Sequence, residues 1–172
     1  MRIGFTGTQK GMTTWQELQL WEQLERLGCT EFVFGDCIGA DIEAATLALL
    51  KGIKIFTVYP QNKDTRKRAW FGNPSRRIDI EGKDYLDAYY ITEDSEFAGV
   101  SIKWMPAEPP LSRNMRIVDN CDWVIATPKE FEHTLRSGTW QTIRYAWKHK
   151  KDKVTIIPPE EHGCVTIQRN GE

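Results

Sequence analysis

Long apolar runs are missing from this chain of 172 residues, because no stretch approaches the roughly 20 consecutive apolar residues that a membrane-spanning helix needs. A secretory signal is not expected either, since a strand-like run begins directly after Met1. The four cysteines show no CxxC spacing, which argues against a zinc site or a disulfide framework. We therefore expect a cytoplasmic protein with free thiols that has no membrane segment and needs no metal or other cofactor.

An excess of charge is also missing, because 23 basic and 24 acidic residues give a formal net charge of −1. Such a chain is a poor partner for nucleic acid or for an anionic membrane surface. The charge is nevertheless uneven: residues 61–83 carry seven basic and three acidic side chains, whereas residues 84–110 carry six acidic side chains and one lysine. We interpret this segment either as a solvated insertion or as a basic lip over an anionic ligand.

Hydrophobic residues make up 40% of the chain and fall into alternating strand-like and helical segments. The patterns predict strands at residues 1–6, 31–34, 53–59, 123–127 and 154–157, and helices at residues 14–27, 41–51, 112–120 and 140–151. Short connections favour right-handed βαβ crossovers. The expected fold is a single α/β domain with three layers, Rossmann-like, with a mostly parallel central sheet and an insertion or lid over residues 61–110.

The ends and faces of the predicted helices carry further signals. Thr14 to Glu17 matches a capping box, and Gly28 suits the end of the first helix. Asp41 resembles the N-cap of the second helix. The apolar faces of the first and third helices are expected to consist of Trp15, Leu18, Trp21, Leu24 and Leu27, and of Leu111, Met115 and Val118.

Three polar or glycine-rich turns each join a strand end to a region that leads into a helix. In an open parallel sheet such turns meet at the carboxyl edge of the strands, where backbone N–H groups and helix dipoles attract anions. A nucleotide is the natural ligand, although a glycine needed only for a tight bend explains each turn alone. The expected ligand-binding residues are Thr6, Gly7, Thr8, Gly35, Asp36, Gly39, Ala40, Asp41, Ser137, Gly138 and Thr139.

Two familiar nucleotide motifs are absent. Residues 4–11 lack the GxxxxGK[ST] spacing of a phosphate-binding loop, and no GxGxxG follows the first strand. ATP hydrolysis and ordinary NAD binding therefore lose support.

Four motifs in order resemble the SLOG superfamily of Rossmann-like proteins, namely residues 35–41, 112–114, 122–126 and 136–146. That superfamily includes Lonely Guy-type nucleotide phosphoribohydrolases, DNA processing protein A, and sensor domains for nucleotide-derived ligands. The resemblance covers nearly the whole chain except residues 61–110. It implies that Arg113 contacts the ligand and takes part in catalysis, with Asn114 as a neighbouring amide partner.

The catalytic signature of the Lonely Guy-type enzymes is incomplete here. Their PGGxGTxxE loop corresponds to residues 136–142, so Thr142 stands where those enzymes carry a glutamate. Glycosidic cleavage passes through an oxocarbenium-like transition state that a carboxylate stabilises, and a threonine cannot take that role. Glu132 is our candidate for the missing acid, and the alternatives are Glu130, Asp36, Asp41, Glu93, Asp94 and Glu96.

Three functions remain open. The first is binding of a nucleotide or a nucleotide-derived phosphorylated molecule, the second is N-glycosidic hydrolysis of a nucleoside monophosphate to free base, and the third is binding of single-stranded nucleic acid through residues 63–77. The related enzymes often form dimers, so a homodimer is one expectation. Candidates for stacking on a base are Trp70, Tyr85, Trp104 and Trp140, although the helical spacing of Trp140 favours the core.

Overall fold

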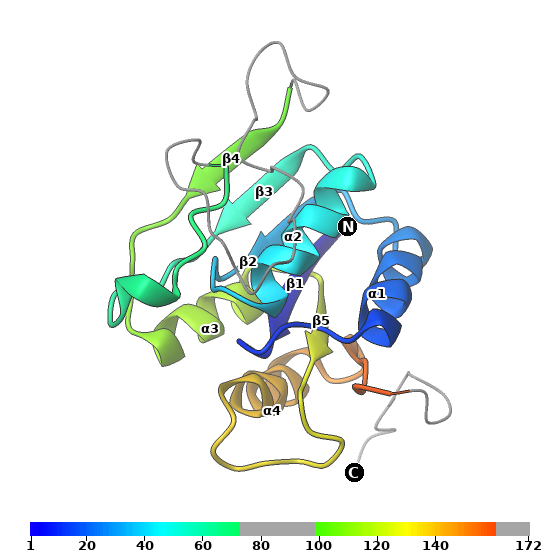
Figure 1. The fold of residues 1–172 in the computed structure, drawn as a ribbon, viewed down its shortest axis with the longest axis vertical. Helices are drawn as coiled ribbons and strands as arrows, with labels where there is room; N and C mark the ends of the chain where they lie inside the picture. Colours follow the sequence, from blue (N-terminus) through cyan, green and yellow to red (C-terminus); the bar gives the residue numbers. More distant parts are fainter. Residues whose placement is uncertain (73–98, 161–172) are drawn as a thin grey trace.

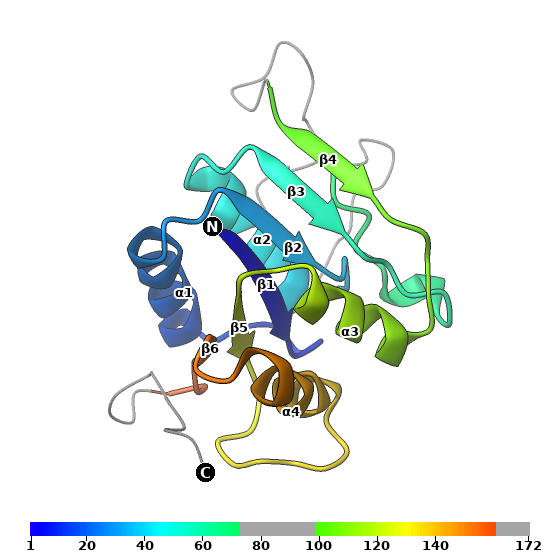
Figure 2. The ribbon, with the colours of Figure 1, turned by 180° about the vertical axis from the view of Figure 1, so that it is seen from behind.

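The computed structural model describes residues 1–72 and 99–160, which form one parallel sheet covered by helices on both faces (Figures 1 and 2). The six strands follow the order β4-β3-β2-β1-β5-β6. The strands are β1 (Arg2–Gly7), β2 (Glu31–Phe34), β3 (Ile55–Val58), β4 (Ser101–Trp104), β5 (Trp123–Thr127) and β6 (Val154–Ile156). The helices are α1 (Thr14–Arg26), α2 (Ala40–Leu50), the short 3-10 helix η1 (Thr65–Lys67), α3 (Pro110–Asp119) and α4 (Gly138–Lys150). This architecture confirms the predicted three-layer α/β fold.

Each central strand buries side chains on both of its faces. In β2, Phe32 and Phe34 belong to the apolar cluster that includes Ile42 of α2. Val33 points the other way and packs with Ile117 of α3. Continuous apolar strands are typical of a parallel sheet between two helical layers, with α1 and α2 on one face and α3 and α4 on the other.

The segment 61–110 is only partly an insertion. Its residues Ser101–Trp104 form β4, which pairs with β3 at the sheet edge, and Phe71 packs on Phe34 and Phe56 with ring centroids 5.3 and 4.9 Å apart. The strand was not predicted because most of its side chains are exposed, which leaves no apolar run in the sequence. The sequence also predicts local structure near residues 85–90 and an edge strand at residues 165–167. Both segments, and the fourth cysteine, Cys164, lie outside the described residues.

Helix α1 differs from its prediction in both cap and buried face. The capping box is formed by Thr13 and Gln16, one residue earlier than expected. Leu18 and Trp21 are 59% and 37% exposed. The buried face instead includes Gln16, because its amide donates to two backbone carbonyls, those of Pro128 and Ile157, at 2.9 Å each.

Helix α3 also turns a different face to the core. Leu111 and Met115 are 51% and 42% exposed, whereas Arg113, Ile117 and Val118 are buried. Burial of the arginine is compatible with the fold because backbone carbonyls accept its hydrogen bonds.

Other local predictions are confirmed. Trp140 lies in the core, and Gly28 follows the C-cap of α1 with φ of +62°. Cys37 and Cys121 are buried free thiols, and Cys29 is half-buried. Within the described residues, no helix is both long enough and apolar enough to cross a membrane.

Candidate functional site

The strand order reverses between β1 and β5, which lie side by side in the middle of the sheet. The chain leaves β1 toward α1 on one face and leaves β5 toward α4 on the other, so a crevice is expected where the two connections diverge. The N–H of Thr8 donates to the carbonyl of Thr127 at 3.3 Å and ties the two strand ends together. The turn Thr6-Gly7-Thr8 therefore lies at this switch point, with Thr6 buried at the end of β1.

The first two predicted turns pack directly against each other. The N–H of Ala40 donates to the carbonyl of Thr8 at 3.0 Å. A Cβ at Gly39, where φ is +86°, would overlap the Gln9 carbonyl, and a Cβ at Gly7 would overlap Ala40. These glycines therefore allow the two turns to approach each other closely.

Asp36 anchors a neighbouring segment. It is fully buried with φ of +57°, its carboxylate accepts the N–H of Phe71 at 2.9 Å, and it lies 3.5 Å from Nε of Arg68. Burial raises the pKa of Asp36 to about 6, against the hydrogen bond from Phe71 and the charge of Arg68. The Arg68 guanidinium in turn lies 3.7 Å from the ring centre of Trp70. Asp36 therefore contacts residues 68–71, which follow η1 in the chain.

Asp41 is in the first turn of α2 and is not its N-cap, which is Gly39. Its carboxylate accepts the N–H of Cys37 at 3.2 Å. Burial raises the pKa of Asp41 to about 6, although the nearby Arg113 charge opposes the rise. Asp41 orders the turn that connects β2 to α2.

Arg113 points into the protein toward the ends of β2 and β3. Its Nη1 donates to the carbonyl of Gly35 at 2.6 Å and to that of Tyr59 at 3.4 Å, and Nη2 lies 3.4 Å from Sγ of Cys37. A Cβ at Gly35 would overlap the guanidinium, so this glycine makes room for the arginine. Arg113 forms no ion pair with Asp119, whose carboxylate accepts the Tyr145 hydroxyl.

The third predicted turn is open. Ser137 caps α4 by accepting the N–H of Trp140 at 3.3 Å. The N–H groups of Gly138 and Thr139 have no hydrogen-bond partner among the described residues, and a Cβ at Gly138 would meet nothing within 4 Å. Glu132 lies in the preceding loop, exposed, and its carboxylate pairs with no described side chain.

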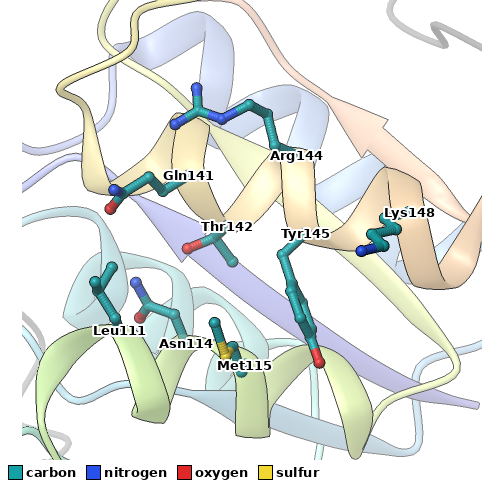
Figure 3. Close-up of a pocket in the computed structure, with 8 residues that line it drawn as sticks. All are labelled: Leu111, Asn114, Met115, Gln141, Thr142, Arg144, Tyr145 and Lys148. Atoms are coloured by element: carbon teal, nitrogen blue, oxygen red, sulfur yellow. The ribbon is translucent and has the colours of Figure 1, made fainter.

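A groove of about 310 Å³ runs between α3 and α4 (Figure 3). Of the residues that line it, Asn114 was predicted to contact the ligand and Thr142 to stand at the position of the family's glutamate, whereas the other lining residues had no predicted role. The exposed apolar side chains of α3, Leu111 and Met115, mark the groove. The sequence alone does not show that these side chains are exposed. The groove is lined by Leu111, Asn114, Met115, Gln141, Thr142, Arg144, Tyr145 and Lys148.

None of the groove residues carries a carboxylate. The hydroxyl of Thr142 donates to the Gly138 carbonyl at 3.0 Å, and Arg144 donates to the carbonyls of Thr134 and Leu135 in the loop before α4. Across the described residues, three or more His, Cys, Asp or Glu side chains are nowhere grouped so as to hold a metal ion. The groove therefore offers two amides and an amine beside the apolar side chains of Leu111 and Met115, and the open N–H groups of Gly138 and Thr139 belong to the same helix just before Gln141. These groups suit a ligand with an anionic end and a less polar body.

No protein-family model matches the chain, and a search of curated proteins finds no significant match.

Proposed function

We propose that this protein binds a nucleotide or a nucleotide-derived phosphorylated molecule at the carboxyl edge of its sheet, in a pocket of the SLOG type that the sequence motifs resemble. The observation that carries the proposal is the groove between α3 and α4, together with the open N-terminus of α4 beside the β1–β5 switch point. A volume of about 310 Å³ is at the lower end of the range for small-molecule sites, which favours a mononucleotide.

The phosphate lies, in this proposal, at the first turns of the two helices. Gly138 and Thr139 offer free N–H groups, and the dipole of α4 favours a negative charge there. Helix α3 adds to this field because it begins after Pro109 without a side-chain cap. Leu111 of α3 and Gln141 of α4 lie at the same end of the groove, so the N-terminal ends of both helices lie at that end (Figure 3).

Binding is better supported than hydrolysis. Thr142 occupies the position of the family's glutamate, and no acid lines the groove. The assigned acid, Glu132, is in the exposed loop before α4. Hydrolysis of an N-glycosidic bond remains the second candidate, and release of free base from common nucleoside monophosphates is the assay that separates it from binding.

Binding of single-stranded nucleic acid has less support. Two cations of the basic stretch are already paired with acids of the protein, since Arg68 lies 3.5 Å from the buried Asp36 and the exposed Arg66 lies 3.0 Å from Asp64. Residues 73–77 of that stretch lie outside the described residues. Retention on single-stranded DNA at moderate salt would support this alternative.

Substitution of Gly138 tests the proposed phosphate position. Gly138→Glu places a carboxylate at the helix N-terminus, where the space is open and the dipole accommodates a negative charge, so the fold should be retained. Gly138→Gln is the matched control because it has nearly the same size without the charge. We expect the glutamate variant to bind AMP, GMP, CMP and UMP at least about 10-fold more weakly than the glutamine variant in titration calorimetry.

Equal affinities of the two Gly138 variants would refute a phosphate at this helix end. If the unmodified protein binds none of the four nucleotides and releases with denaturation no phosphorylated molecule detectable by mass spectrometry, the proposed function itself is wrong.

A further inference from the structure

Two amide side chains face each other across the groove. Asn114 extends from α3 and Gln141 from α4, and Figure 3 shows both at the N-terminal end of the groove. Neither side chain has a hydrogen-bond partner among the described residues; Asn114 is half-buried, whereas Gln141 is exposed. Half-buried amides normally have partners, because an unpaired donor or acceptor costs free energy. The two amides are thus available to a bound molecule.

The groove residues of α4, and the open N–H groups that precede them in the helix, follow a definite order along its axis. The open N–H groups belong to Gly138 and Thr139, Gln141 follows, then Tyr145, and Lys148 lies at the far end. With a rise of about 1.5 Å per residue, Gln141 lies roughly 4.5 Å and Tyr145 roughly 10 Å along the axis from Gly138. The parts of a 5′-mononucleotide follow one another in the same sense and at comparable spacing, from phosphate to ribose to base.

The middle of the groove has an apolar and aromatic wall. Met115 and Tyr145 approach each other there, as Figure 3 shows. The Tyr145 hydroxyl donates to the Asp119 carboxylate, with oxygen distances of 3.0 and 3.2 Å, and its ring centre lies 4.1 Å from that of His149. These contacts hold the tyrosine ring in place, and a held ring with a flexible thioether beside it suits the face of a planar base.

From this order we infer that Asn114 and Gln141 recognise the ribose hydroxyls, so that the groove selects ribonucleotides over 2′-deoxyribonucleotides. Each amide offers an NH₂ donor and a carbonyl acceptor, which match the two hydroxyls of a cis-diol since each hydroxyl is both donor and acceptor. The inference rests on the proposed function. It specifies which residues contact the sugar of the nucleotide, between the proposed positions of the phosphate and the base.

Titration calorimetry on the full chain tests the selection. The probe is whichever of AMP, GMP, CMP and UMP binds most tightly, together with its 2′-deoxy counterpart. Loss of one neutral hydrogen bond predicts that the deoxynucleotide binds roughly 3- to 10-fold more weakly. The ratio of the two affinities is the readout, because a substitution that merely loosens the groove weakens both ligands and leaves their ratio unchanged.

Asn114→Leu and Gln141→Leu each remove an amide and keep a side chain of similar size. At least one of them should weaken binding of the ribonucleotide and bring the ratio close to one. Lys153→Gln is the control, since this exposed lysine lies outside the groove and its substitution should leave the ratio as in the unmodified protein.

Two results overturn the inference while the proposed function stands: equal affinity of the unmodified protein for the two nucleotides, or a ratio that neither leucine variant changes. If no nucleotide binds, the proposed function fails, and the inference fails with it.

Discussion

Arg113 is a charged side chain that the fold removes from solvent and surrounds with main-chain acceptors. The carbonyls of Gly35 and Tyr59, at the ends of β2 and β3, accept its hydrogen bonds, and its charge partly offsets the nearby buried carboxylate of Asp41. A side chain so engaged ties α3 to two strand ends. This geometry favours a role in organising the carboxyl edge, whereas the resemblance to the Lonely Guy-type enzymes implied direct contact with the ligand.

The consequence is a large stability effect of Arg113→Met. The variant loses hydrogen bonds from a buried charged group and leaves Asp41 without its nearby cation, so the free energy of unfolding should fall by about 2–4 kcal/mol. The measurement is urea denaturation followed by circular dichroism. Arg116→Met is the control, because Arg116 is 58% exposed and its pair with Glu108 should contribute less than about 1 kcal/mol. Equal losses in the two variants would contradict this account.

At the scale of elements, the start of α1 shows how a helix cap is placed. Thr13 accepts the N–H of Gln16, Gln16 accepts the N–H of Thr13, and the Thr13 hydroxyl also donates to the carbonyl of Pro159 at 2.7 Å. The adjacent Thr14 offers the same functional group in the sequence but is already helical. The choice between the two threonines depends on the position of the chain after β6.

Alanine substitution of the two threonines separates these roles. Thr13→Ala should lower the free energy of unfolding by about 1–2 kcal/mol through loss of the cap. Thr14→Ala should change it by less than about 0.5 kcal/mol, because alanine is the best helix former and no cap is lost. Thermal unfolding of both variants gives the comparison. A greater loss of stability in the Thr14 variant would show that Thr14 is the helix cap, as the sequence pattern predicted.

For the whole molecule, two buried carboxyl groups at the end of β2 oppose folding when they are ionised. Burial raises the pKa of both Asp36 and Asp41 to about 6, above the value of about 4 expected in the unfolded chain. The folded protein therefore binds more protons than the unfolded one between about pH 4 and pH 6. The contribution of these groups to stability falls as the pH rises through that window and is constant above it.

The variant Asp41→Asn tests this pH dependence. The asparagine oxygen can still accept the N–H of Cys37, and the group no longer ionises. The stability of the variant relative to the unmodified protein should increase between pH 4.5 and pH 7, as measured by urea unfolding at several pH values. A difference that stays constant over this range would show that the pKa of Asp41 is not raised.

Other expectations for the whole molecule remain predictions. They include the cytoplasmic location and the homodimer that the family resemblance implies.

Much of the fold was predictable because its signals are short-range. The strands at residues 31–34 and 123–127 agree with β2 and β5 at both ends, since each is an apolar run bounded by a turn residue. Local chemistry also predicted the three turns at the carboxyl edge, which parallel strands necessarily bring to one side of the sheet.

The sequence by itself determined the alternation of strands and helices, the parallel sheet and the edge at which its turns gather, because periodicity, glycine and proline act over a few residues. Only the tertiary structure decided that the first two turns fill each other's space, that Gly138 stays open and that Arg113 turns inward. Those outcomes depend on contacts between residues far apart in the chain, such as Gly35 with Arg113, and local sequence carries no information about such contacts.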